Sequence, residues 1–468
     1  MEPASKMKPA AGAGMRASTG GGLSEALDRY FNISGNRSTV RTEILAGIAT
    51  FLAAMYIIVV NPAILADAGI PFSAALTSTV IISFFASLAM GLYAKNPILV
   101  APGMGMNALF TYTLVLGAGI EWQTALGCVF WAGVIFTVLA VFNVRAWVVD
   151  AIPAQLRYAI ASGIGLFIAL IGFTSAQFVV HNPATLVGIA PMDPIRITFL
   201  LGLGATAVLV ARKVTGALIL GIVLTTLMAV PIGRIWGDAT SFWPEAIARP
   251  TMVDWQGLVA MPDFSSLLQV DIWGALSVAY FPFIFVFLFT NFFDALSTFM
   301  GLSEAAGLKD EKGNPRNMRQ AMTVDAVTSV LSAPVGTSPT NSYIESGAGI
   351  AQGGRTGLVA VTAALLFLPF LFLSPLLSLV PPIATAPVLI LVGLFMMAPL
   401  AKIDWTDYTI AIPAFLAMIL MPLTYSITHG IAFGFVSYVV VKLLSGQARD
   451  IKLTMWIVAL LSLLMLLH

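Results

Sequence analysis

The feature that most constrains this chain of 468 residues is a series of apolar runs, each about as long as a membrane span. Hydrophobic residues make up 59% of the sequence and charged residues only 10%, and the mean hydropathy is +0.94. Soluble domains carry about 25% charged residues. An apolar run of about 20 residues can cross a bilayer as a helix. The sequence therefore predicts an all-α integral membrane protein embedded in a lipid bilayer.

The apolar runs divide into two sets of seven. Candidate spans of about 20 residues lie near 43–66, 72–93, 98–118, 121–142, 155–178, 197–211, 214–233, 270–300, 318–335, 338–353, 356–376, 382–401, 406–424 and 427–444. A longer loop, 234–268, separates the two sets, and its Trp236, Trp243 and Trp255 suit a membrane interface. A C-terminal apolar segment lies within 450–468. Its run 453–467 is short for a span, and either lies on the membrane surface or makes a further crossing.

The two ends of the chain and its basic residues predict the orientation. Residues 1–23 are rich in Gly, Ala and Pro and read as a disordered cytoplasmic tail, followed by an amphipathic helix from "LSEALDRYFNI". A cytoplasmic N-terminus places most basic residues on the inner side, namely Arg29, Arg37, Arg41, Lys95, Arg145, Arg212, Lys213, Lys309, Lys312, Arg316, Arg319, Arg355, Lys402, Lys442, Arg449 and Lys452. Only Arg196, Arg234 and Arg249 then fall outside. The positive-inside rule therefore predicts a multi-pass protein of the cell (inner) membrane with its N-terminus in the cytoplasm.

An odd number of spans in each half means that the second half enters the membrane from the opposite side. The halves also echo each other: "KVTGALILGIV" at 213–223 resembles "SITHGIAFGFV" at 426–436, and "ILADAGI" at 64–70 resembles "GLSEAAGL" at 301–308. This is the pattern of an inverted repeat, which is typical of secondary transporters.

The third and tenth spans are interrupted by Pro and Gly. In "NPILVAPGMGMNALF" these residues predict an extended segment to about Pro102 and a helix from about Met104. In "APVGTSPTNSYIESGAG" the residues Pro334, Gly336 and Pro339 disfavour helix, and a helix should start near Asn341.

Open backbone inside a membrane is tolerated only where it is buried in protein or lines a cavity. Two half-helices that enter from opposite faces bring their N-termini together near the midplane, where free N–H donors and partial positive charge gather. The breaks therefore predict a polar pocket inside the bilayer. The alternative is that these Gly and Pro residues only kink or pack the helices.

Four polar side chains lie in or beside the predicted pocket. Asp294 lies deep in the eighth span, where an acid costs roughly 2.5–3.5 kcal/mol, and Asn291 precedes it by one helical turn. Glu345 and Asn107 lie at the starts of the two half-helices. Structural roles are the alternatives: Asp294 bonded to a half-helix N-terminus, Glu345 as a cap, and Asn107 satisfying broken backbone.

Several function classes find no support in the sequence. The single Cys128 cannot form an internal disulfide, and the three histidines are scattered. No metal-binding or nucleotide-binding motif is present, so we predict no metal, no cofactor and no enzymatic activity. A net charge of +1 gives no reason to expect nucleic acid as a partner.

Five stretches of the sequence resemble a known family. They are "VRTEILAGIATF", "MYIIVVNPAIL", "APGMGMNALF", "FFDALSTFMG" and "GTSPTNSYIESGAGIAQGGRTG". The sequence resembles the nucleobase–ascorbate transporter superfamily (nucleobase:cation symporter-2) over residues 27–445, and within it the AzgA-like adenine/guanine/hypoxanthine permeases.

The resemblance implies fourteen spans in two inverted repeats. It implies a core domain from 43–142 and 270–376 and a gate domain from 155–233 and 382–444. It also implies purine:H⁺ symport, with the base held by the residues that match the family's motifs, Asp294, Glu345 and Asn107. The sequence departs from the family where Asn291 replaces an acid, where "FDALST" replaces "FDTxGT", and at "SPTN", 338–341. These departures leave the exact base and the coupling open.

The hypothesis drawn from these features is import of a purine base together with a proton by alternating access. The candidate substrate-binding residues are Asp294, Glu345, Asn107, Asn291, Gly105, Thr340 and Ser342. Carboxylates can accept N–H bonds from a base, and a carboxylate removed from water can hold a proton near neutral pH. Glu345 and Asp294 are therefore the candidates for proton coupling. Glu345 is favoured, because the absence of an acid at Asn291 leaves less repulsion on ionised Asp294.

Other functions remain open at this stage. A transporter of the same architecture could move xanthine, uracil or an anion, although two carboxylates disfavour an anion. A facilitator would lack proton coupling, and a channel would need a repeated polar pore-lining face that the sequence does not show. Homodimer formation also stays open.

Overall fold

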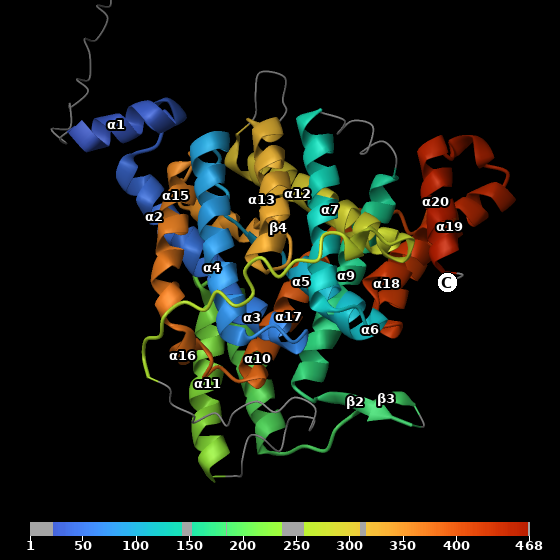
Figure 1. The fold of residues 1–468 in the computed structure, drawn as a ribbon, viewed down its shortest axis with the longest axis horizontal. Coiled ribbons are helices and arrows are strands. Elements are labelled where there is room, and N and C mark those ends of the chain that lie inside the picture. Colours follow the sequence, from blue (N-terminus) through green and yellow to red (C-terminus); the bar gives the residue numbers. More distant parts are fainter. Residues whose placement is uncertain (1–21, 143–151, 184, 236–256, 309–314, 467–468) are drawn as a thin grey trace, which may run out of the picture.

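The structure is a computed structural model that describes residues 22–142, 152–183, 185–235, 257–308 and 315–466. It is almost entirely helical (Figure 1), which confirms the predicted all-α membrane fold. The N-terminal tail up to residue 21 and the three loop tryptophans, 236, 243 and 255, lie outside the described residues.

The first half of the chain forms helices and two short strands before the loop at 236–256. In chain order these are α1 (Gly22–Phe31), η1 (Ser34–Asn36), α2 (Val40–Ala54), α3 (Ile57–Asp67), α4 (Phe72–Ala89), η2 (Met90–Ala94), β1 (Val100–Pro102), α5 (Met104–Ala108), η3 (Leu109–Val115), α6 (Leu116–Ala118), α7 (Trp122–Val141), α9 (Ala154–Ser175), β2 (Val179–Asn182), β3 (Leu186–Ile189), α10 (Pro194–Ala211) and α11 (Ala217–Ile235). The hairpin β2–β3 was not predicted from the sequence.

The second half contains one short strand among its helices. The elements are η5 (Gly274–Leu276), η6 (Val278–Tyr280), α12 (Phe281–Ala306), α13 (Met318–Val335), β4 (Thr340–Ser342), η7 (Ile344–Ser346), α14 (Gly347–Ala351), α15 (Leu358–Phe367), η8 (Leu368–Phe372), α16 (Ser374–Leu377), α17 (Pro382–Met396), η9 (Ala398–Lys402), α18 (Tyr408–Leu423), α19 (Ile427–Leu444), η10 (Ala448–Asp450) and α20 (Leu453–Leu466).

The helices lie where the apolar runs predicted them, with three corrections. Eight helices among the described residues are long and apolar enough to span a membrane, and four shorter apolar helices accompany them. The helix of the eighth run begins only at Phe281, because 270–280 forms short turns. Pro334 lies inside α13, whose end is set instead by Gly336 with a φ of 91°. In the tenth run the chain is still extended at Asn341, and helical structure begins at Ile344.

The two interrupted spans meet as a small antiparallel sheet in the interior. Strand β1 pairs with β4, with Ala101 opposite Asn341, and every residue of both strands is buried. The Gly103 N–H donates to the Pro339 carbonyl at 2.9 Å just beyond the strands. The pairing satisfies backbone groups that could not otherwise be buried. Extended structure up to Pro102 and a helix from Met104 confirm the prediction for the third span.

The long helices fall into two packing groups. In the first group α2, α4, α7, α13 and α15 contact one another, and in the second α9, α10, α11, α17, α18 and α19 do so. Helix α12 packs on α7 and also contacts α19 and α20. The C-terminal run forms α20, which lies against α19 at the edge of the molecule and exposes Leu453 and Leu460 (Figure 1).

Small residues allow the closest approach within the second packing group. A Cβ atom on Gly165 of α9 would lie 2.5 Å from the carbonyl oxygen of Gly393 in α17, and one on Gly393 would clash in return. We expect Gly165→Ala to destabilise the protein by about 1–3 kcal/mol, because the packed backbones must separate. The apparent melting temperature in detergent checks this. Gly204→Ala is the matched control, because a Cβ there meets no atom within 4 Å. Its melting temperature should equal that of the wild type. Equal melting temperatures for the two variants would contradict the expectation.

The predicted topology can be tested at two exposed positions. Figure 1 shows α1 and the β2–β3 hairpin at opposite ends of the molecule. In a Cys128→Ala background, Val187→Cys in the hairpin should react with an impermeant thiol reagent on intact cells. Ser445→Cys, after α19, should react only after the cells are permeabilised. Both positions are exposed, and the reverse labelling pattern would invert the orientation predicted from the basic residues.

Candidate functional site

A cavity of about 300 Å³ lies where the two interrupted spans meet α9, α12 and α17. Its size falls at the lower end of the range for small-molecule sites, about 300–1,000 Å³. Asp294 and Glu345 both line it, as do Gly105 and Ser342. Four of the seven predicted site residues therefore share one cavity, built around the ends of the β1–β4 sheet.

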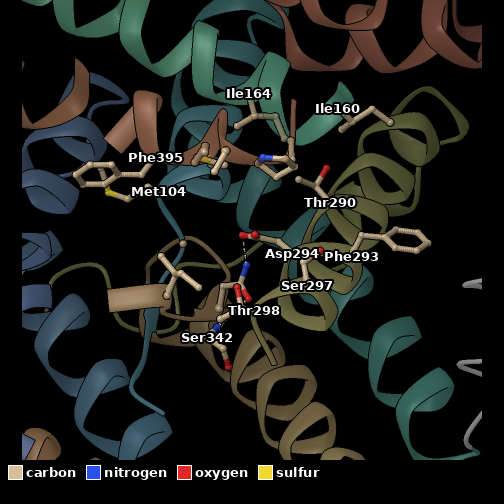
Figure 2. A pocket seen from close by; sticks show the side chains of 18 of the residues that line it. Met104, Ile160, Ile164, Thr290, Phe293, Asp294, Ser297, Thr298, Ser342 and Phe395 are labelled. Carbon is tan, nitrogen blue, oxygen red and sulfur yellow. Dashed lines mark hydrogen bonds between the residues drawn. The ribbon is translucent and has the colours of Figure 1, made fainter. Parts of the chain in front are cut away.

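Asp294 is held at the cavity by the tenth span. The side-chain amide of Asn341 in β4 donates to Asp294 Oδ2 at 2.5 Å. Figure 2 shows the Asp294 carboxylate pointing into the cavity, between Ile164 of α9 and Ser342 of β4. Asp294 therefore accepts from a side-chain amide, whereas the structural alternative had expected it to bond to a half-helix N-terminus.

Glu345 lies in η7, and its partner comes from the first span. The Tyr56 hydroxyl donates to Glu345 Oε1 at 2.6 Å, and Tyr56 is buried but lines the cavity. Tyr56 lies at the interruption between α2 and α3. Sequence reasoning missed both the interruption and the tyrosine, since the residues around Tyr56 are apolar and include no Gly or Pro at that point.

The remaining predicted site residues form a layer behind the cavity rather than part of its lining. The Asn107 amide donates to Asn61 Oδ1 at 3.0 Å, and the Asn291 amide donates to Ser329 Oγ at 2.8 Å. All four of these side chains are buried.

Thr340 is the third predicted residue in this layer. Its hydroxyl lies 2.8 Å from that of Thr328 in α13. Like Asn107 and Asn291, it is absent from the lining of the cavity. In this state the three residues can fix the strands and half-helices that present Asp294 and Glu345, without touching a ligand there.

Asp325 in α13 is a buried acid that sequence reasoning missed. Its Oδ2 accepts from Ser342 Oγ at 2.8 Å, and its fully buried Oδ1 has no hydrogen-bond partner among the described residues. The Ser342 N–H in turn donates to Asn341 Oδ1 at 2.8 Å. A series of hydrogen bonds through Ser342 and Asn341 of β4, one of them from the Ser342 backbone N–H, therefore links Asp325 to Asp294.

Asn291 leaves no acid one turn before Asp294, but this link joins Asp294 to another buried acid, which weakens the argument that ionised Asp294 meets less repulsion. The rule that singled out Asp294, an acid inside an apolar span, applies equally to Asp325 within 318–335 and could have found it.

A further buried carboxylate, Glu43 of α2, has a structural role. It accepts the N–H groups of Arg355 and Thr356, both at 3.0 Å, and the Thr356 hydroxyl at 2.7 Å. It therefore fastens the link between α14 and α15, outside the cavity.

The wall facing the carboxylates comes from the second packing group and is mainly apolar. Ile160, Ile164 and Phe395 line it, as Figure 2 shows. Two cations also line the cavity, Arg157 and Lys402.

The cavity reaches the surface near Lys402 and Ile344. Both residues line it and both are exposed, Ile344 by 52%. An apolar slot with acceptors at one end suits a flat molecule that carries N–H donors. Among the residues that the structure describes, no group of His, Cys, Asp and Glu could hold a metal ion.

Solved structures with a similar fold are transporters. The transmembrane domain of the cyanobacterial bicarbonate transporter BicA matches with a TM-score of 0.60 and 17% identity, over 85% of this chain and 97% of that chain. SLC26A9 matches with a TM-score of 0.58 and 12% identity, over 87% of this chain and 66% of that chain. At these identities the likeness concerns the fold, which is that of the 7+7 inverted-repeat transporters.

The relatives in sequence are permeases. The adenine permease AdeP of Escherichia coli strain K12 is 41% identical over 441 residues, which cover 94% of this chain and 95% of the relative. The guanine/hypoxanthine permease PbuO of Bacillus subtilis strain 168 is 40% identical over 426 residues, 90% of this chain and 96% of the relative. A model of the xanthine/uracil permeases, described as a permease family, matches residues 41–433. The chain thus belongs to the nucleobase–ascorbate transporter family and is a permease, not an enzyme.

Proposed function

We propose that the protein imports purine nucleobases by proton symport, through alternating access. The observation that carries the proposal is the pair of carboxylates, Asp294 and Glu345, that face one apolar cavity. Purine bases are flat and present N–H donors on their edge, and charge-assisted hydrogen bonds to carboxylates are the stronger kind. The relatives named as adenine and guanine/hypoxanthine permeases support this choice of substrate.

The proton has three candidate sites, since Asp325 joins Glu345 and Asp294. An acid enclosed in protein is retained at low cost when it is neutral, so each can take up a proton when the base binds. One charge that crosses about 100 mV supplies roughly 2.3 kcal/mol. This would support accumulation of the base on the order of 50-fold, at about 1.4 kcal/mol per tenfold.

Alternating access would come from movement of one packing group against the other. In this proposal the first group, with α12 and the β1–β4 sheet, is the core domain and carries the acids. The second group is the gate domain and carries the apolar wall.

The cavity reaches the surface near Lys402, at the end predicted to be cytoplasmic. On the far side of the cavity the two groups touch, with the Tyr112 and Tyr425 rings 6.1 Å apart and the Ile427 N–H donating to Thr113 Oγ1 at 3.4 Å. These features support an inward-facing state.

The test is uptake of radiolabelled adenine, guanine and hypoxanthine into cells that lack their own purine permeases. We expect uptake of at least one base, competition by unlabelled purines but not by uracil, and loss of accumulation when a protonophore is added. Uptake that survives the protonophore without accumulation would identify a facilitator. Uptake of none of these bases would remove the purine assignment.

A same-fold anion transporter is the second candidate, because the bicarbonate transporter BicA has a similar fold. An anion site needs net positive charge beside the ligand. The inner end of this cavity presents two acids instead, which favours the nucleobase.

A further inference from the structure

Two cations line the cavity, and a purine base does not account for them. Arg157 lies in the first turn of α9, and Lys402 ends η9; among the described residues they are the cationic members of the lining. A purine base is neutral, so its binding by Asp294 and Glu345 calls for no positive charge on the opposite wall. A cavity lined by both acids and cations suits a ligand that carries both N–H donors and an anionic group.

Both cations are held against aromatic rings. The Arg157 guanidinium lies 4.9 Å from the centroid of the Phe293 ring, and the Lys402 ammonium lies 5.6 Å from that of Tyr158. Contacts of this kind hold a cation in place. Since Phe293 precedes Asp294 on α12, Arg157 of α9 packs against the same helix that presents the acid.

The acids and Lys402 also differ in depth. Asp294 and Glu345 are bonded to Asn341 and Tyr56 in the interior. Lys402 is exposed where the cavity reaches the surface. The volume of about 300 Å³ is in the range for ligands larger than a single base.

We propose that this cavity also takes a purine nucleoside 5′-monophosphate, with its base on Asp294 and Glu345 and its phosphate on Arg157 and Lys402. The inference rests on the proposed purine function and extends it to regulation. The nucleotide would enter only from the side of Lys402, occupy the base site and block transport. Such a ligand is the product of a reaction that transfers ribose phosphate to an imported base. The nucleoside monophosphate would then inhibit further uptake of the base.

The experiment measures displacement of radiolabelled base from purified full-length protein. The competitors are AMP, GMP and IMP and the matching nucleosides, which differ only in the phosphate. The wild type should bind the matching monophosphate more tightly than its nucleoside. Arg157→Gln and Lys402→Gln should each weaken binding of the monophosphate by about tenfold more than they weaken binding of the base, because one charge-assisted hydrogen bond to the phosphate is lost. Arg157→Lys should keep most of the preference for the monophosphate over the nucleoside. The control is Arg41→Gln, which changes an exposed cation at the start of α2 and should keep that preference in full.

The outcomes distinguish failure of this inference from failure of the proposed function. If base binds but nucleoside and monophosphate compete equally, this inference is overturned and the proposed function stands. If the two Gln variants lose base and monophosphate affinity in parallel, the cations act on base binding or folding, and the inference is likewise overturned. If neither base nor nucleotide binds, both the proposed function and this inference fail. In membrane vesicles, inhibition of uptake by monophosphate applied only at the face of the β2–β3 hairpin would also contradict the inference.

Discussion

Replacing Glu345 by Gln is expected to lower purine uptake by about 10–100-fold while the protein still reaches the membrane. The change keeps the shape of the side chain but removes the charge, and hydrogen bonds to a charged group contribute about 1.5–3 kcal/mol. Gln also cannot carry the coupled proton. The measurement is initial-rate uptake of radiolabelled base, normalised to the amount of protein in the membrane.

Tyr56→Phe is the matched control for this prediction. It removes the hydroxyl that donates to Glu345 Oε1 at 2.6 Å and leaves the ring in its buried place. We expect a smaller loss, about fivefold, because the carboxylate and its contacts to the base remain and only the hydrogen bond from Tyr56 is lost. Normal uptake by well-expressed Glu345→Gln would show that this acid only caps its helix. A greater loss in Tyr56→Phe than in Glu345→Gln would assign the main role to the tyrosine.

Asp294→Asn is expected to weaken base binding by about 10–100-fold and yet leave its pH dependence intact. A base that binds together with a proton binds more tightly as the pH falls, so affinity plotted against pH has a slope. If Glu345 carries the proton, Asp294→Asn should lower base affinity at every pH and keep its slope. Glu345→Gln should instead remove the pH dependence of the binding that remains. Affinity for hypoxanthine or guanine in purified protein, across about pH 5 to 8, measures both effects.

Asp325→Asn completes this comparison. Asp325 is joined to Asp294 through Ser342 and Asn341, so it can hold the proton without touching the base. A flat pH profile in Asp325→Asn, with base affinity at low pH preserved, would move the proton to this residue. A flat profile in Asp294→Asn alone would reverse the assignment. No pH dependence in the wild type would remove proton symport altogether.

Local rules applied to single residues predicted much of the fold and part of the site. Pro102 lacks a backbone N–H donor and the glycines beside it disfavour helix, so the extended stretch and the helix from Met104 could be predicted from the local sequence. The cost of an acid in a membrane span identified Asp294 and could equally have identified Asp325. The run 338–353 was harder, because Asn341 is compatible with a helix start but is held extended by its pairing with Ala101.

The remaining features depend on contacts between segments far apart in the chain. Nothing near Tyr56 shows that it meets Glu345, since that hydrogen bond exists only after α2 packs beside the tenth span. Asn107 and Asn291 looked like ligand-binding residues because they are polar and lie near the breaks. Their partners, Asn61 and Ser329, lie on other helices and turn them away from the cavity.

The β1–β4 sheet has a consequence for the origin of such a protein. Each strand comes from a different half of the chain, and the acids sit beside the strand of the second half. A single half, inserted alone, would leave the edge of its strand unpaired within the bilayer, at a cost of several kcal/mol for each open backbone group. Only a second copy inserted upside down could pair with it. An ancestor of half this length would therefore have had to work as an antiparallel dimer, with its ligand site shared between two subunits, before gene duplication placed both in one chain.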